Sequence, residues 1–374
     1  MSSLIRMHKN LLVFFAPVTQ QWDGLVIFCS SSYLLIDIKI PHQEILTEVI
    51  YIMKGKIISL LKENGGYMSG EKISEELGIT RSAVWKHINS LKEDGYEIDS
   101  VRNKGYMLTA EPDHLDEEKI RSKLDVSAIG KRLVILKTVD STNEEAKRLA
   151  RSGGQHGLIV TSDSQTNGKG RFSRKWSSGP DGGLYFSILL KPDLPPSDIA
   201  SITLSAGYAV CLAVREYTGL EAAIKWPNDI ILGSKKLCGI LTEMAAQSDR
   251  IDYVIIGIGI NVNNQSFPEE IAHKAISMRM ALGRPIDRSD FFACVINKLD
   301  RVIGDFLISL SIDDIAHFKT LCATMNRTVT IVRAGQEITG TACDVSPGGE
   351  LIVRLEGGKE ITVTSGEVTV QGIY

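Results

Sequence analysis

Residues 167–176 read Asn167-Gly168-Lys169-Gly170-Arg171-Phe172-Ser173-Arg174-Lys175-Trp176, with two glycines and four cationic side chains in ten residues. Glycine lets the backbone approach a ligand closely, and lysine and arginine donate charge-assisted hydrogen bonds to carboxylate or phosphate oxygens. The stretch therefore predicts an anion-binding loop. Taken alone, a cluster of glycine and lysine is more often a solvated basic surface turn.

Two familiar nucleotide motifs are absent from this sequence. The Gly168-Lys169 pair is followed by Gly170 instead of serine or threonine, and Asp163 stands where a P-loop needs its first glycine. The run Gly257-Ile258-Gly259 lacks the third glycine of a dinucleotide fingerprint. A nucleotide must therefore be held in another way.

Three further segments combine strand ends with polar side chains. Leu133 to Val139 is an apolar run followed by Asp140-Ser141-Thr142-Asn143, which predicts a strand and then a helix N-terminus. Lys225-Trp226-Pro227-Asn228-Asp229 lies between two apolar runs and places a cation at a strand end. Gly257 to Asn263 ends another apolar strand with small residues and amides, which let a flat ring approach the backbone.

In this order, and with Gln165 ahead of the glycine loop, the four segments resemble the catalytic domain of biotin-protein ligases. The resemblance covers roughly residues 115–321. It implies a reaction in which the biotin carboxylate attacks the α-phosphorus of ATP, and the resulting adenylate passes biotin to a lysine of a biotin carboxyl carrier protein. Cations that stabilise the developing charge matter more for this chemistry than a general base.

The resemblance also implies roles for individual residues. Lys225 and Arg171 are expected to be catalytic, with Lys225 bridging the biotin carboxylate and the α-phosphate. The chain departs from the family pattern at Lys169, where arginine is common, and at Phe172-Ser173, where Arg-Gly is common. The expected biotin-binding residues are Ser141, Thr142, Asn143, Gln165, Lys169, Gly170, Arg171 and Lys225, and the expected ATP-binding residues are Arg171, Arg174, Trp176, Asn228 and Asn261.

A second signal precedes the ligase-like part. Apolar spacing predicts a helix that ends at Asn64-Gly65, a second helix opened by Ser69, and a third from Arg81 to Lys92 with Thr80 as its N-cap. A hairpin with its tip at Arg102 to Gly105 follows. This is the pattern of a winged helix-turn-helix, and it resembles the DNA-binding half of the family members that also repress biotin-synthesis operons.

The expected DNA contacts are polar side chains on the third helix and at the hairpin tip. Because the net charge of the chain is −3, affinity for operator DNA must come from this local face, and a homodimer formed with bound adenylate would double the phosphate contacts. A protein-docking role for the winged helix is the alternative. The residues expected to bind DNA are Arg81, Ser82, Lys86, His87, Arg102 and Lys104.

The expected class is α+β, with helices against one mixed sheet in the central domain and a small SH3-like β-barrel at the C-terminus. The alternating runs after Leu321 predict the barrel strands. The predicted divisions are 1–52, an extension of unknown role, with Met53 as an alternative start of the protein; 53–110, the winged helix-turn-helix; 115–321, the ligase domain; and 325–374, the barrel.

Composition bears on the cellular compartment of the protein and on whether it binds a membrane or a metal. Six cysteines without a Cys-x-x-Cys pair favour a reduced, cytoplasmic compartment, and the seven histidines show no metal-ligand spacing. The apolar runs of the first fifty residues are interrupted too early for a membrane span. We expect no membrane partner and no protein-bound metal, with Mg²⁺ entering only through the use of ATP.

Two alternatives to a bifunctional ligase and repressor remain open. One is a ligand-responsive transcription factor that has lost catalysis, against which the retained Lys225 and glycine loop argue. The other is a ligase for a different acyl group, lipoate or octanoate, against which the Lys225-Trp226-Pro227-Asn228-Asp229 segment and the DNA-binding start argue.

Overall fold

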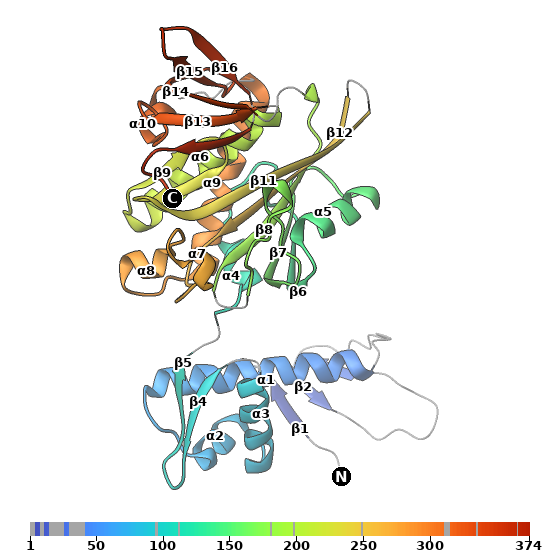
Figure 1. Ribbon diagram of the computed structural model, residues 1–374. Helices are drawn as coiled ribbons and strands as arrows, with labels where there is room; N and C mark the ends of the chain where they lie inside the picture. Colours follow the sequence, from blue (N-terminus) through green and yellow to red (C-terminus); the bar gives the residue numbers. More distant parts are fainter. Residues whose placement is uncertain are drawn as a thin grey trace. The chain divides into compact units, whose positions relative to one another are not determined.

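The structure is a computed structural model that describes residues 4–7, 11–14, 26–29, 42–93, 96–110, 113–179, 182–196, 199–247, 250–309, 315–333, 336–364 and 366–374. The chain forms two compact units, Met1–Pro112 and Asp113–Tyr374 (Figure 1). Most of the predicted extension 1–52 lies outside the described residues. Its described parts are the strands β1 (Leu4–Met7), β2 (Leu11–Phe14) and β3 (Val26–Cys29), which form one antiparallel sheet, and the start of α1.

The first unit contains the predicted winged helix-turn-helix. Its helices are α1 (His42–Asn64), α2 (Gly70–Leu77) and α3 (Arg81–Glu93), and its hairpin is β4 (Glu97–Val101) with β5 (Gly105–Ala110). The predicted caps are confirmed, because Ser69 accepts from the Lys72 amide and Thr80 Oγ1 accepts from the Ala83 amide at 3.2 Å. The first helix is longer than the sequence pattern indicated, since it begins at His42.

The second unit is built on a seven-stranded mixed sheet with the order β6-β7-β8-β12-β11-β10-β9. Only the β6–β7 pair is parallel among its described strands. The strands are β6 (Leu133–Val139), β7 (Leu158–Gln165), β8 (Leu184–Leu190), β9 (Ala222–Lys225), β10 (Asp229–Leu232), β11 (Lys235–Gln247) and β12 (Arg250–Ile260). The helices of this part are α4 (Glu117–Ser122), α5 (Thr142–Arg151), α6 (Ile199–Thr218), α7 (Glu269–Ala272), α8 (Met278–Leu282), α9 (Arg288–Ser309) and α10 (Ile315–Leu321).

Alternation along the central strands separates the two faces of this sheet. On β8, Phe186 and Ile188 belong to the main core with residues of α6 and α9, whereas Leu189 belongs to a second cluster with Ala146 and Ala150 of α5. The helices α6 and α9 therefore cover one face, and α5 covers part of the other (Figure 1). Because α5 covers only part of its face, the rest of that face is available for a binding site.

One described helix, α6, is long and apolar enough to cross a membrane by length and composition. However, 67% of its apolar window is buried inside the protein, and nine of its 20 residues belong to the main core. This is how the core helix of a globular domain is packed.

The C-terminal part of the second unit is a five-stranded antiparallel sheet with the order β16-β15-β14-β13-β17. The sequence predicted four of these strands and missed β17. Closure into an SH3-like barrel stays a prediction. The strands are β13 (Thr328–Arg333), β14 (Gln336–Val345), β15 (Leu351–Leu355), β16 (Glu360–Val363) and β17 (Glu367–Val370).

Candidate functional site

One cavity of about 660 Å³ lies on the open face of the seven-stranded sheet. Its wall includes the start of α5, the glycine loop, the ends of β9 and β12, and β17 of the C-terminal sheet. Every residue that the sequence predicted for biotin or ATP lines this one cavity: Ser141, Thr142, Asn143, Gln165, Lys169, Gly170, Arg171, Arg174, Trp176, Lys225, Asn228 and Asn261. Their individual roles stay predictions.

One end of the cavity is a buried network of hydroxyls and amides. Gln165 Oε1 accepts from the backbone amide and the hydroxyl of Thr142, at 2.8 and 3.1 Å. Ser187 donates to Asn143 Oδ1 at 2.6 Å, and Asn143 Nδ2 donates to Glu243 at 2.8 Å. Ser141 precedes α5 but makes no side-chain capping bond. These hydrogen bonds hold the side chains in place, as a selective polar subsite requires.

Glycines of β11 and β12 form a flat floor beside this network. Gly239 and Gly259 are direct cross-strand partners, and a Cβ at Gly259 would lie 2.5 Å from the indole of Trp176. A Cβ at Gly257 would lie 2.1 Å from Asn143 Oδ1. The sequence predicted that the small residues from Gly257 onward let a flat ring approach the backbone, and in the structure the indole of Trp176 lies against Gly259.

The glycine loop leaves β7 and contacts the C-terminal sheet. Arg171 donates to Asn228 Oδ1 at 2.6 Å and to the carbonyl of Gly366 at 2.8 Å, and Arg174 pairs with Glu367. Phe172 and Ser173 both have positive φ, 54° and 56°, which strains residues that carry a side chain. Phe172 is 59% exposed, so the tip of this loop lies in solvent.

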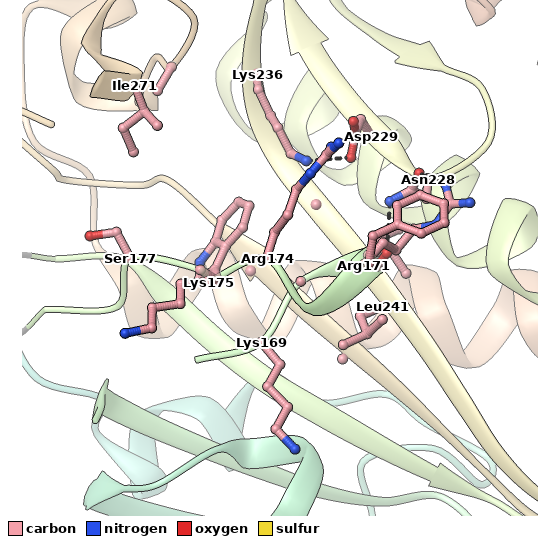
Figure 2. Close-up of a pocket in the computed structure, with 18 of the residues that line it drawn as sticks. Lys169, Arg171, Arg174, Lys175, Ser177, Asn228, Asp229, Lys236, Leu241 and Ile271 are labelled. Atoms are coloured by element: carbon pink, nitrogen blue, oxygen red, sulfur yellow. Dashed lines mark hydrogen bonds and ion pairs between the residues drawn. The ribbon is translucent and has the colours of Figure 1, made fainter. Parts of the chain in front are cut away.

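The loop cations do not all face the same way. Lys169 forms an ion pair with Glu144 of α5 at 2.5 Å and lowers the pKa of that carboxyl, together with Lys147. Figure 2 shows Lys169 pointing away from Lys236 and Asp229, and Arg174 extending toward them. Arg174 is therefore better placed than Lys169 to bind an anion near the ion pair of Lys236 and Asp229.

Lys225 lies at the end of β9 and is only 8% exposed. Burial lowers its pKa, although nearby Asp229 acts in the opposite direction. Among the described residues its ammonium has no ion pair, and Asp229 is bonded to Lys236 at 2.7 Å. The next residue, Trp226, is anchored by its indole N–H to the Gly349 carbonyl at 2.9 Å. A buried, unneutralised ammonium on a rigid strand end is suited to an anionic ligand.

Two predicted nucleotide residues make structural bonds as well. Asn228 accepts from Arg171 and donates to the Ile240 carbonyl at 3.0 Å. Asn261 donates to the carbonyls of Lys236 and Ile276, at 3.4 and 3.1 Å. Other residues of the cavity wall had no predicted role in the site, and they include the polar side chains of Glu367, Tyr374, Lys236, His273 and Lys274.

The first unit carries a separate polar surface. Val84, Ile88 and Leu91 of α3 are buried, while Arg81, Ser82 and Lys86 are exposed, as predicted. His87 is half-buried, and burial together with the charge of Lys54 lowers its pKa. Trp85, which no sequence motif marks, is 57% exposed on the same helix.

The tip of the hairpin is also exposed. Arg102 and Lys104 flank Asn103, which has a φ of 67°, and the ammonium of Lys104 lies 5.6 Å from the ring centroid of Tyr67. Helix and tip together give the first unit the arrangement of a winged helix-turn-helix, with cations on both elements.

Models of known protein families match both the part of the chain that forms the cavity and the part that forms the winged helix-turn-helix. The model of the "Biotin/lipoate A/B protein ligase family" matches residues 135–261, an "HTH domain" matches 54–107, and the "Biotin protein ligase C terminal domain" matches 324–370. Together the three matches cover the C-terminal sheet and most of the cavity wall and of the winged helix-turn-helix, whereas Tyr374 and the wall residues between 267 and 275 lie outside them.

Two similar proteins have names that state both a ligase and a repressor function. The chain is 41% identical to the "Bifunctional ligase/repressor BirA" of Bacillus subtilis over 68% of this chain and 79% of that protein. It is 29% identical to the protein of that name from Escherichia coli, over 83% of this chain and 97% of that one. Among solved structures, a biotin protein ligase from Aquifex aeolicus in complex with biotin and ATP is similar, with 31% identity, a TM-score of 0.57 and coverage of 64% of this chain and 99% of that one.

Proposed function

The chain belongs to the biotin/lipoate A/B protein ligase family, and on that premise we propose that it is a bifunctional biotin-protein ligase and biotin-responsive transcriptional repressor. Biotin and ATP react in the cavity of the second unit to give biotinyl-5′-AMP. The adenylate then passes biotin to a lysine of a biotin carboxyl carrier protein. The winged helix-turn-helix of the first unit binds operator DNA of biotin genes.

The first step joins two anions. A carboxylate oxygen of biotin attacks the α-phosphorus of ATP, a new P–O bond forms, and the bond to pyrophosphate breaks. In the second step the acceptor amine attacks the acyl carbon, AMP leaves with the electrons of the broken C–O bond, and the amine releases a proton to water. Fixed cations at the α-phosphate are the main requirement of the first step, because they offset the repulsion and the developing charge.

The observation that carries the proposal is the buried ammonium of Lys225. It lies on the wall of the cavity at 8% exposure, and no carboxylate among the described residues pairs with it. Such a group is costly without an anion, so an anionic ligand gains from binding there. We assign Lys225 to the contact between the biotin carboxylate and the α-phosphate, with Arg171 as the second cation.

Biotin needs a polar subsite at its other end, because its ureido ring offers one carbonyl and two N–H groups. The network around Thr142 and Asn143 supplies donors and acceptors of this kind, held by Gln165 and Ser187. We therefore assign the biotin ring to this end of the cavity, with Ser141 completing it. Lys169 and Gly170 border the path from this end to Lys225.

We assign ATP to the side of the cavity near β10 and the glycine loop. Arg174, Trp176 and Asn228 line it, and Asn261 supports its wall. Mg²⁺ accompanies ATP, whose phosphate oxygens are its preferred ligands. The two carboxylates of this wall, Asp229 and Glu367, are bonded to Lys236 and Arg174, so we assign them no metal. No cluster of three or more metal-ligating side chains occurs in the part of the chain that the structure describes.

We further propose a cytoplasmic protein that forms a homodimer when the adenylate is bound. A dimer would place two winged helices on two half-sites and so double the total number of phosphate contacts. The catalytic domain would then control DNA binding through ligand-dependent association. The predicted domains 53–110, 115–321 and 325–374 divide this work into DNA binding, chemistry and closure of the cavity.

Pyrophosphate release from ATP by the purified chain tests the enzyme, with biotin, lipoate and octanoate compared. Biotin-dependent release is expected, and release with lipoate or octanoate instead would favour a ligase for another acyl group. A mobility shift on promoters of biotin genes tests the repressor. A biotin-dependent shift without release with any acid would indicate a transcription factor without catalysis.

A further inference from the structure

Tyr374, the last residue of the sequence, lies in the cavity beside Lys225. The Lys225 ammonium is 3.9 Å from the centroid of the Tyr374 ring. The tyrosine hydroxyl donates to Asp229 Oδ2, and its backbone amide donates to the Ser234 carbonyl at 3.1 Å. The aromatic ring therefore covers one side of the cation that carries the proposed chemistry.

The segment that presents this ring is fixed to the C-terminal sheet. Ile373 is 3% exposed, and its amide donates to the Val370 carbonyl at 3.1 Å. Arg327 donates to the Gln371 carbonyl at 3.1 Å, and Gly372 allows the turn with a φ of 81°. Several independent contacts thus determine where Tyr374 lies.

Asp229 should be the natural partner of Lys225. The two residues are direct cross-strand partners in the antiparallel pair of β9 and β10, where opposite charges usually interact. Instead, Asp229 Oδ1 pairs with Lys236 at 2.7 Å, and Oδ2 accepts from the Tyr374 hydroxyl. Tyr374 therefore has two contacts that bear on Lys225: it faces the cation, and it holds the carboxylate that would otherwise neutralise it.

We propose that Tyr374 is a positioning residue that keeps Lys225 charged, oriented and unpaired until the substrates bind. This inference rests on the proposed ligase function. The face of an aromatic ring attracts an ammonium through its charge but does not occupy the ammonium's N–H donors as a carboxylate would. The N–H groups of Lys225 therefore remain available to the biotin carboxylate and the α-phosphate. Because the ring belongs to the C-terminal segment, that segment contributes to the chemical step itself.

The test compares Tyr374→Phe, which keeps the ring and loses the hydroxyl, with Tyr374→Leu, which loses both. Biotin-dependent pyrophosphate release is measured in full-length protein, with kcat and KM separated and thermal unfolding as the control for folding. We expect Leu to lower kcat by about 30-fold, with the KM for biotin changed by less than about twofold. Phe is expected to lower kcat by no more than about threefold, because the cation–π contact survives. Asp229 then loses the hydroxyl donor at Oδ2 but keeps its ion pair with Lys236 through Oδ1, so it is only partly released toward Lys225.

Three results would overturn the inference. An unchanged kcat in the Leu variant would show that the ring does not serve Lys225. Equal losses in Phe and Leu would assign the effect to the hydroxyl alone. A lower KM for ATP at unchanged kcat would make Tyr374 a competitor of the nucleotide instead of a positioning residue.

A second measurement does not depend on turnover. The rate at which an amine-specific reagent labels Lys225 in ligand-free protein is followed by mass spectrometry, with exposed Lys359 as the internal reference. The Leu variant should label several times faster at Lys225 than the wild type or the Phe variant, and equal rates would refute the contact. If wild-type protein releases no pyrophosphate, the proposed function fails, and this labelling result alone decides whether Tyr374 covers Lys225.

Discussion

Gln165, at the end of β7, accepts two hydrogen bonds from Thr142 in the first turn of α5. Its amide also donates to Ser178 Oγ at 2.9 Å. One side chain thus ties together the strand, the helix and the segment after the glycine loop. Since Thr142 is only 4% exposed, its donors have no ready replacement partner in water.

Replacing Gln165 with leucine should weaken biotin binding. The change leaves two buried donors of Thr142 without an acceptor, and we expect the KM for biotin to rise roughly 10- to 100-fold with a smaller change in the KM for ATP. Steady-state pyrophosphate release measures both constants. Gln155→Leu, on an exposed turn, is the matched control. Equal increases in both KM values would place Gln165 outside the biotin subsite.

Lys225→Ala should abolish most adenylate formation. The fold, and the DNA binding of the ligand-free protein, should remain unchanged. Loss of the cation at the developing charge is expected to lower kcat by about 10²- to 10³-fold. Pyrophosphate release and thermal unfolding are measured together, with Lys235→Ala on the nearby hairpin as the control. Turnover preserved in Lys225→Ala would exclude this residue from the mechanism.

The pH profile of adenylation should also report Lys225. Burial lowers its pKa below the usual 10.5, and the charged form binds the anions, so kcat/KM should fall as pH rises through that lowered value. At pH values below this pKa, Lys225 is charged and does not limit the activity. Lys225→Arg should move the alkaline decline upward, because arginine stays charged. An alkaline limb that is the same in Lys225→Arg would assign the titration to another group.

Arg171→Gly should make the enzyme release its adenylate. The wild-type side chain joins the glycine loop to Asn228 and to the Gly366 carbonyl, so its loss detaches the loop from the C-terminal sheet. We expect adenylate to dissociate about tenfold faster or more, since hydrogen bonds from a charged group are lost. Release of labelled adenylate into a trap is the measurement, and Arg151→Gly at the exposed end of α5 is the control. Unchanged dissociation would contradict the loop assignment.

Local patterns predicted those parts of the site that neighbouring residues determine. The strand before Ser141, the cation at the end of β9 and the exposed face of α3 follow from apolar spacing and capping, and the structure confirms each. The glycine loop was identifiable because its composition is unusual over only ten residues. Such features need no information about distant segments.

The contacts that complete the site were not predictable in this way. Glu367 and Tyr374 reach Arg174 and Lys225 only because the C-terminal sheet packs beside the cavity, and no local pattern marks either residue. The pairing of Asp229 with Lys236 depends on the register of β10 and β11, and the donor to the other carboxylate oxygen, Tyr374, lies far along the chain. Likewise, β17 is a short strand whose partner, β13, lies far ahead of it in sequence.

Lys86→Ala and Arg102→Ala should each weaken operator binding for all sequences by a similar factor. Both side chains are exposed, one on α3 and one at the hairpin tip, and we expect each to neutralise one phosphate per half-site. The slope of log affinity against log salt concentration should therefore become shallower by about one per lost contact. Fluorescence anisotropy with promoter fragments at several salt concentrations measures this slope, and Lys359→Ala in the second unit is the control. A slope that matches the control would mean that the helix and hairpin face something other than DNA, and a protein-docking role would then be favoured.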